Sequence, residues 1–342
     1  MLANFFGKSN PVNFIVIFSI FLGFFLVSSI SLIPISTIDF SIVLEKVLQL
    51  VLFLVFFFFY NFILSKNKLT LYNSYGFLIF VLLFGFFPDT MLSRNELFLN
   101  ILVLVYLRRL YSLRSGKDLH KKIFDSGFWL GILFLLAPKM VLFGILLFLS
   151  IWLFQKINLR TLLIPCLGFL APVICYVTYC FWFNQIEEFT ASFFWYANYN
   201  FELFTDSSIF IPTIVLVTLV LISILVKTPK VISISGNYRN YWILILFNLF
   251  IAITILLIQN TLHESQLILL FFPISVILTN WLESIQKPFL KNIFIAALLC
   301  TPIILFIIQD HKKDHLHLPT PERYILSHLI LDRYQQSIIL YL

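Results

Sequence analysis

The sequence predicts an all-α membrane protein, a bundle of transmembrane helices. Hydrophobic residues make up 61% of the 342-residue chain and charged residues only 11%, whereas soluble domains carry about 25% charged residues. Phenylalanine outnumbers glycine by 42 to 10, which is more apolar surface than a soluble core can bury. The apolar residues also fall in long runs, and a helix needs about 20 such residues to cross a bilayer. Together these observations exclude a soluble enzyme, a disordered chain and a small disulfide-stapled domain.

Eleven apolar runs follow one another along the chain, and each is predicted to form a membrane-spanning helix. The first run is not a cleavable signal peptide, because it lacks a small-residue cleavage site and leads directly into further apolar runs. The predicted spans cover residues 14–33, 48–64, 71–87, 97–107, 124–136, 141–154, 162–183, 209–226, 241–258, 267–281 and 293–308.

The fourth, fifth and sixth runs are short for a hydrocarbon core of about 30 Å. Only the four residues 137–140, among them Ala137, Pro138 and Lys139, separate the fifth run from the sixth. Two interpretations stay open. The pair could form two complete spans, or a broken pair whose tip stops inside the membrane, where irregular backbone must be covered by protein or water. The count therefore ranges from ten to twelve spans.

The distribution of charge predicts the orientation of the bundle. With the N-terminus inside and the spans alternating, 16 of the 23 basic residues lie in inner loops with only three acids. The outer loops then hold the other 7 basic residues and 13 acids. We therefore expect the N-terminus inside and the C-terminus outside, and we interpret the net charge of +7 as an orientation signal.

The densest basic stretch runs from Arg108 to Lys122 in a predicted inner loop. Its simplest interpretation is an orientation anchor that rests on anionic lipid headgroups. Binding of a phosphorylated donor is the alternative. Nucleic acid is not expected as a partner, because no soluble domain accompanies the basic stretch.

Residues 1–308 are expected to form a single transmembrane domain, and residues 309–342 a polar connector followed by a helix at the outer face. The four cysteines all fall within predicted spans and are interpreted as packing residues. The histidine-containing tract at residues 311–317 is interpreted as a solvated connector. Residues 321–342 mix apolar and polar positions in a weakly amphipathic pattern, which fits a helix lying on the membrane or docking an envelope protein.

Candidate chemistry concentrates in the outer loops, where the acids lie. Asp39 follows the first predicted span and Asp89 follows the third; such carboxylates can act as general bases or bind a metal. Arg94 and Lys139 could hold a lipid-linked phosphate. The aromatic candidates, which could stack on a sugar or form an interfacial belt, are Trp195, Tyr196 and Tyr199.

The stretch DSGFWLGILFLLAPKMVLFGILLFL, residues 125–149, resembles a recurrent segment of the polytopic GT-C glycosyltransferases. Gly127, Gly131, Pro138 and Lys139 match its layout of a glycine-paced helix that ends in proline and lysine. The resemblance implies transfer of a sugar from a polyprenyl-phosphate donor at the outer face. It also implies that Asp39 is the catalytic base, and that Asp89 assists with a divalent metal or the acceptor.

The N-terminal segment FFGKSNPVNF, residues 5–14, is similar to the start of an uncharacterised family of polytopic bacterial inner-membrane proteins. This resemblance implies a multi-pass location in the bacterial inner membrane and no particular activity. Three functions therefore stay open: a GT-C-like transferase, a non-catalytic scaffold or accessory subunit of an envelope assembly, and a transporter. Membrane lipids are expected partners in each case.

Overall fold

The computed structural model describes every residue except 31–39, 156, 192–206, 234–235, 260–261 and 316–342. The described residues form helices and connecting turns, with no β-strand among them. The longer helices are α2 (Pro11–Ile30), α3 (Phe40–Asn67), α4 (Tyr75–Phe86), α5 (Arg94–Tyr111), α6 (Leu119–Leu136), α7 (Phe143–Phe154), α8 (Leu159–Trp182), α10 (Ser207–Ile232), α11 (Asn237–Leu257), α12 (Ile268–Ser284) and α13 (Pro288–His315). The short elements are α1 (Leu2–Phe6), α9 (Ile186–Ala191) and the 3-10 turns η2 (Pro88–Met91), η3 (Ser112–Ser115), η4 (Pro138–Leu142) and η6 (Glu264–Leu267).

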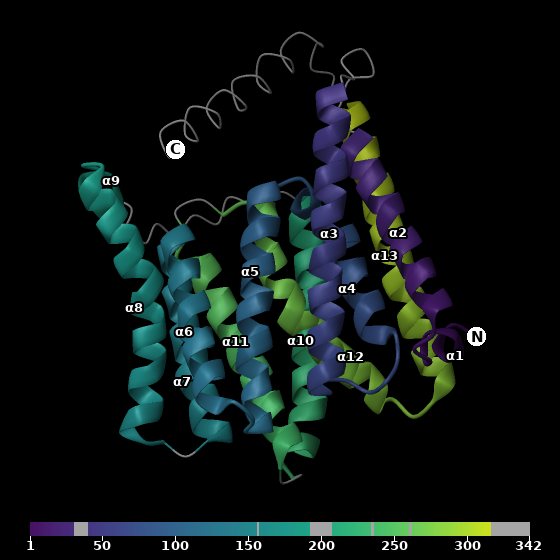
Figure 1. Ribbon diagram of the computed structural model, residues 1–342. Coiled ribbons are helices and arrows are strands. Elements are labelled where there is room, and N and C mark those ends of the chain that lie inside the picture. The colour runs from purple at the N-terminus through teal and green to yellow at the C-terminus, as the bar shows by residue number, and fades with distance from the viewer. Residues whose placement is uncertain (31–39, 156, 192–206, 234–235, 260–261, 316–342) are drawn as a thin grey trace.

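The long helices lie side by side in one bundle, and consecutive helices run in opposite directions (Figure 1). Each of the eleven predicted apolar runs overlaps one of these helices. Among the described residues, six helices are long and apolar enough to cross a membrane: Pro11–Ser29, Phe40–Asn67, Leu159–Trp182, Ile209–Ile232, Tyr238–Leu257 and Glu264–Ser284. This architecture is that of a multi-pass membrane protein.

The other predicted spans correspond to shorter or more polar helices. Tyr75–Phe86, Pro138–Phe154 and Pro288–Ile304 are apolar but shorter, while α5 and α6 carry charged residues in their terminal turns. Membrane crossing by these five helices, and hence the total of eleven, stays a prediction. The polar connector expected from residue 309 onward begins as helix, because α13 continues to His315.

The centre of the bundle is built on α4 and α12. Every residue of α4 is buried, and the helix contacts α2, α12 and α13. Phenylalanine rings fill the space around it: the Phe21 centroid lies 4.9 Å from that of Phe53 and 4.7 Å from that of Phe57. The Phe84 centroid lies 4.9 Å from that of Phe271 on α12. The Phe21–Phe57 and Phe84–Phe271 pairs are edge-to-face, and such pairs add to the dispersion that holds apolar helices together.

Glycines bring α6 and α8 into close contact. A Cβ at Gly127 would lie 2.1 Å from the Pro165 carbonyl oxygen, and one at Gly168 would lie 2.3 Å from the Phe124 oxygen. Small residues allow helix backbones to approach in membrane bundles, where van der Waals packing replaces the hydrophobic effect. Gly127 and Gly131 carried part of the GT-C resemblance, and here they serve the packing of this helix pair.

The break between the fifth and sixth runs is the 3-10 turn η4. The Lys139 ammonium donates a hydrogen bond of 3.0 Å to the carbonyl oxygen of Ile258, the residue that directly follows α11. The turn therefore lies level with the end of a helix that is long enough to span. This placement fits the interpretation of α6 and α7 as two separate passes.

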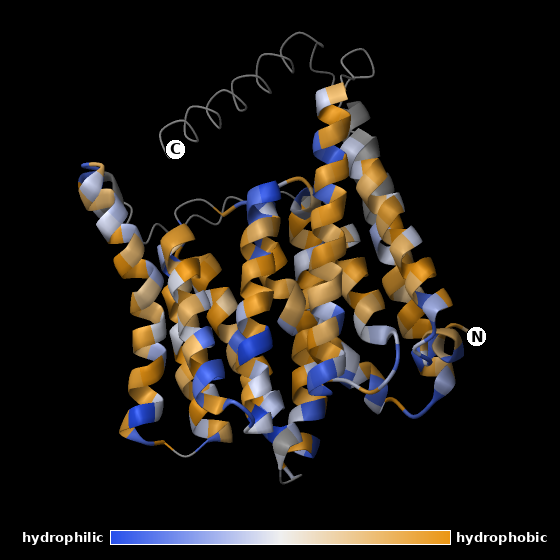
Figure 2. Ribbon diagram, in the orientation of Figure 1, coloured by the Kyte–Doolittle hydropathy of each residue, from blue (hydrophilic) through white to orange (hydrophobic). Residues whose placement is uncertain are grey.

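Hydrophilic residues gather at the two ends of the bundle, and the helix sides between them are predominantly apolar (Figure 2). The cysteines form no disulfide; Cys180 is buried, and Cys166, Cys175 and Cys300 lie exposed on helix sides. The exposure of these three agrees with an apolar setting but not with the packing role expected for all four.

Candidate functional site

Two cavities lie against the C-terminal turns of α3, at the lower end of the bundle in Figure 1. One has a volume of about 500 Å³ and the other about 430 Å³. We call the larger one the polar cavity and the smaller one the basic cavity, after the side chains that line them. Lys68 lines both.

The basic cavity collects cations that are far apart in sequence. The end of α3, the end of α5 with η3, and the first turn of α6 all meet here, since consecutive helices run in opposite directions. The partial negative charge at a helix C-terminus also favours basic side chains there. The cavity is lined by Phe62, Lys66, Asn67, Lys68, Arg108, Arg109, Tyr111, Ser112, Arg114, Ser115, Lys122 and Tyr241.

One of the six cations of the basic cavity forms an ion pair with a described carboxylate. Arg109 Nη2 lies 3.2 Å from Asp125 Oδ2, and this is the ion pair found in the described part of the chain. Arg108 and Arg114 lie over aromatic rings instead, with guanidinium carbons 4.8 Å and 5.4 Å from the centroids of Phe62 and Tyr241. Cation–π contacts orient such groups without neutralising them. The lining of the cavity therefore carries an excess of positive charge.

Lys122 forms part of the cavity wall. Its ammonium donates to the Ser115 hydroxyl at 2.5 Å and to the Ser112 carbonyl at 3.1 Å. Burial lowers the pKa of Lys122, and the nearby charge of Asp118 opposes that shift. Arg109 adds to the lowering, because a neighbouring cation disfavours the protonated amine. A bound anion would relieve this repulsion.

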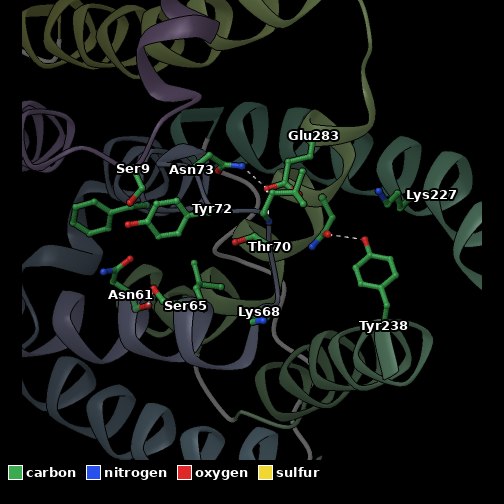
Figure 3. A pocket seen from close by; sticks show the side chains of 14 residues that line it. Ser9, Asn61, Ser65, Lys68, Thr70, Tyr72, Asn73, Lys227, Tyr238 and Glu283 are labelled. Carbon is green, nitrogen blue, oxygen red and sulfur yellow. Dashed lines mark hydrogen bonds between the residues drawn. The ribbon is translucent and has the colours of Figure 1, made fainter. Parts of the chain in front are cut away.

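The polar cavity is enclosed by the end of α3, the turn that follows it, and parts of α10, α11 and α12 (Figure 3). Its wall is held by hydrogen bonds between distant segments. Glu283 Oε1 accepts from the Leu71 amide at 2.9 Å and from the Asn73 side chain at 2.7 Å. The Tyr238 hydroxyl donates to Asn280 Oδ1 at 2.8 Å. The cavity is lined by Ser9, Asn61, Leu64, Ser65, Lys68, Thr70, Leu71, Tyr72, Asn73, Phe77, Lys227, Tyr238, Asn280 and Glu283.

The site residues expected from the sequence belong to other parts of the chain. Asp89 lies exposed in η2, where its backbone amide donates to Glu264 Oε1 at 3.0 Å. Arg94 is exposed at the first position of α5, the element after η2. Lys139 uses its ammonium to bind the end of α11. The remaining candidates, Asp39, Trp195, Tyr196 and Tyr199, lie outside the described residues.

The part of the chain that the structure describes contains no preformed metal site. No group of three or more histidine, cysteine, aspartate or glutamate side chains is arranged there to hold an ion. Asp89 is therefore not part of such a group, and Asp39 lies outside the described residues.

Sequence reasoning missed the polar cavity. Glu283 and Asn73 are separated by 210 positions, and no local pattern joins them. One signal was present: Glu283 is one of only three acids in the predicted inner loops. An isolated acid among many bases is a reason to look for a specific partner.

Comparison with known proteins shows the family of the chain. A model described as a family of unknown function (DUF6427) matches residues 8–313, and the chain belongs to that family. No curated protein and no solved structure matches the chain.

Proposed function

We propose that this chain is a multi-pass protein of the bacterial inner membrane that binds an anionic phosphate group in its basic cavity. The bundle would sit with this end in the cytoplasm, the N-terminus inside and the C-terminus outside. Support for the orientation comes from the positive-inside rule, since the end that gathers Lys66, Lys68, Arg108, Arg114 and Lys122 around one cavity carries the excess of basic residues.

The observation that carries the proposal is the uncompensated charge of the basic cavity. Five of its six cations have no carboxylate within ion-pair distance among the described residues. A surface that only anchors the protein spreads its cations over the headgroup layer, whereas these converge from three segments on a concave site. Convergent polar groups in a concavity are typical of a binding site.

Phosphate is the anion that fits the chemistry best. Arginine presents a planar fork of donors that matches phosphate oxygens, and lysine adds a mobile point charge. Phe62 and Tyr241 hold Arg108 and Arg114 in place, which lowers the entropy lost when the donors engage a ligand. The phosphate could belong to an anionic lipid headgroup or to a soluble phosphorylated molecule.

Lipid retention tests this proposal. The full chain would be purified from phosphatidylcholine membranes that contain phosphatidylglycerol, and the retained lipid measured by native mass spectrometry. A direct hydrogen bond to a charged group contributes about 1.5–3 kcal/mol, so we expect the pair of changes Arg108→Gln and Arg114→Gln to lower phosphatidylglycerol retention by tenfold or more. Glycerol 3-phosphate added to phosphatidylcholine nanodiscs tests the soluble source.

The matched control also removes two positive charges from the basic end of the bundle. Lys117 and Lys121 are exposed and lie outside the cavity lining, so Lys117→Gln with Lys121→Gln should leave retention within about twofold, because diffuse surface charge is screened by salt. Equal losses in the two double variants would show that the cations act as a general anchor, and the binding proposal would be wrong.

A GT-C-like transferase at the opposite end is the second candidate. The exposure of Asp89 and Arg94 on consecutive elements favours it, because both side chains are accessible to a substrate. Lys139 fits the phosphate-contact role less well, since its ammonium already binds Ile258. The discriminating variant is Asp39→Asn, which should abolish transfer of a polyprenyl-linked sugar at unchanged membrane abundance; undiminished transfer would remove Asp39 as the base.

The accessory-subunit hypothesis depends on residues 321–342, which lie outside the described residues. Docking of an envelope protein by this segment stays a proposal. Co-purification of a partner with the intact chain, and its loss when these residues are deleted, would support it; the same partner retained by the shortened chain would refute it.

A further inference from the structure

The polar cavity carries charges of both signs on separate walls (Figure 3). Glu283 comes from the end of α12, Lys227 from α10, and Lys68 from the turn after α3. Among the described residues, neither lysine forms an ion pair with Glu283. A cavity that keeps an acid and two bases apart offers both kinds of charge to a ligand.

One carboxylate oxygen of Glu283 can still accept hydrogen bonds. Both of its hydrogen bonds, from Leu71 and Asn73, go to Oε1, and Oε2 accepts no hydrogen bond from the described residues. A carboxylate has about four acceptor sites on its two oxygens. Because Glu283 is among the lining residues, an ammonium group in the cavity could reach its unused oxygen.

The two lysines also have unused hydrogen-bond donors. Lys227 Nζ lies 5.8 Å from the centroid of the Tyr238 ring, a weak contact that leaves its three donors unused. Lys68 is exposed and lines the cavity. Neither ammonium donates a hydrogen bond to a described residue. Together they provide two positive donors for one anionic group.

The rest of the lining suits the head of a lipid. Asn61, Thr70 and Tyr72 supply polar groups, whereas Leu64 and Phe77 supply apolar surface. The cavity also lies where α3 and α12 end and α11 begins, and polar helix ends suit the headgroup layer of a membrane better than its acyl chains. A ligand with a charged head and an apolar stem could use both types of surface.

We propose that the polar cavity binds a phosphate ester that carries a primary amine, the chemistry of a phosphoethanolamine head, with its ammonium on Glu283 and its phosphate between Lys227 and Lys68. The ammonium donates to the carboxylate, and the lysines donate to the phosphate oxygens. A purely anionic ligand would leave Glu283 repelling it. A divalent cation would find a single carboxylate, although Ca²⁺ takes six to eight oxygen ligands.

This inference does not rest on the basic cavity. The two cavities share Lys68 alone, so variants of Arg108 and Arg114 test one and variants of Glu283 and Lys227 test the other. The same chemistry can come from phosphatidylethanolamine in the membrane or from free phosphoethanolamine in the cytoplasm, and the test separates these sources.

The experiment compares phosphatidylethanolamine with phosphatidylcholine, whose quaternary ammonium has no proton to donate. The full chain in nanodiscs with equal amounts of both lipids is analysed by native mass spectrometry for the lipid it retains. We expect the wild type to retain phosphatidylethanolamine at least fivefold over phosphatidylcholine. Free O-phosphoethanolamine is titrated in phosphatidylcholine nanodiscs; binding there, without a lipid preference, assigns the soluble source.

Glu283→Gln is the informative variant, because its amide oxygen can still accept the hydrogen bonds from Leu71 and Asn73. It should reduce the lipid preference, or the binding of free phosphoethanolamine, to within twofold of no selectivity. Lys227→Gln should weaken the same binding through the phosphate. Glu187→Gln, an exposed acid on α9, is the control and should change nothing.

The pair Arg108→Gln and Arg114→Gln should leave the phosphatidylethanolamine preference intact, which keeps this proposal separable from the proposed function. If Glu283→Gln fails to fold, Lys227→Gln decides the outcome. The proposal is overturned if the wild type neither prefers phosphatidylethanolamine nor binds free phosphoethanolamine. It is equally overturned if a folded Glu283→Gln protein, or a folded Lys227→Gln protein, binds as the wild type does.

Discussion

Lys68 adopts a backbone conformation that normally belongs to glycine, with φ of 53°. It follows the end of α3, where the Leu69 amide donates to the Leu64 carbonyl at 3.2 Å, the bond that closes a Schellman-type helix end. Glycine would fit this position without strain. The lysine instead puts an ammonium at the border of both cavities, and unfavourable backbone conformations often persist at functional positions.

Lys68→Gly should therefore change stability and binding in opposite directions. Relief of the left-handed strain should stabilise the fold by about 1 kcal/mol, while loss of the ammonium should weaken retention of phosphatidylglycerol and phosphatidylethanolamine. Thermal unfolding in detergent and lipid retention by mass spectrometry measure the two effects. Asn184→Gly, also at positive φ (55°) but outside both cavity linings, should leave retention unchanged. Unaltered binding by Lys68→Gly would remove this lysine from the site.

At the scale of helices, α8 is held to the bundle mainly by α6. Only 17% of the apolar stretch of α8 is buried inside the bundle, compared with 78% for Glu264–Ser284. The attachment of α8 to the bundle therefore depends on its glycine contacts with α6. Gly168 is the position on α8 at which an added methyl group would meet the Phe124 carbonyl. Backbone cannot move aside as easily as a side chain.

Gly168→Ala should destabilise the α6–α8 pair by about 1–3 kcal/mol, the usual cost of overpacking. Thermal unfolding in detergent should show the loss. The matched control is Gly23→Ala in α2, where an added Cβ meets nothing within 4 Å; it should be neutral or slightly stabilising. A Gly168→Ala protein as stable as Gly23→Ala would contradict the close packing.

For the molecule as a whole, the sequence predicts the helices but not which side chains come together between them. Apolar runs predicted the helices because membrane helices must satisfy their backbone internally, and each run overlaps a helix. The cations of the basic cavity were visible, but no sequence pattern joins Lys66 to Arg108 or Glu283 to Asn73. Those contacts depend on which helices are neighbours. The periodicity of the apolar residues does not specify this. The acids pointed to the predicted outer loops, whereas both cavities lie at the end of the bundle where α3 ends.

Orientation is a property of the whole chain, and accessibility of single cysteines can measure it. In a variant without native cysteines, Arg94→Cys should react with a membrane-impermeant maleimide in intact spheroplasts. Lys117→Cys should react only after permeabilisation, because the positive-inside rule places the basic end in the cytoplasm. Both residues are exposed, so burial does not bias the comparison. The reverse pattern would place the basic cavity outside.

Phosphate binding in the basic cavity is the function that we propose for this chain. Its most direct test is an experimental structure of the full chain in nanodiscs that contain phosphatidylglycerol. We predict phosphate density within hydrogen-bonding distance of Arg108 or Arg114, among the cations that no carboxylate neutralises. A map that resolves lipids elsewhere around the bundle but shows no phosphate in this cavity would contradict the account.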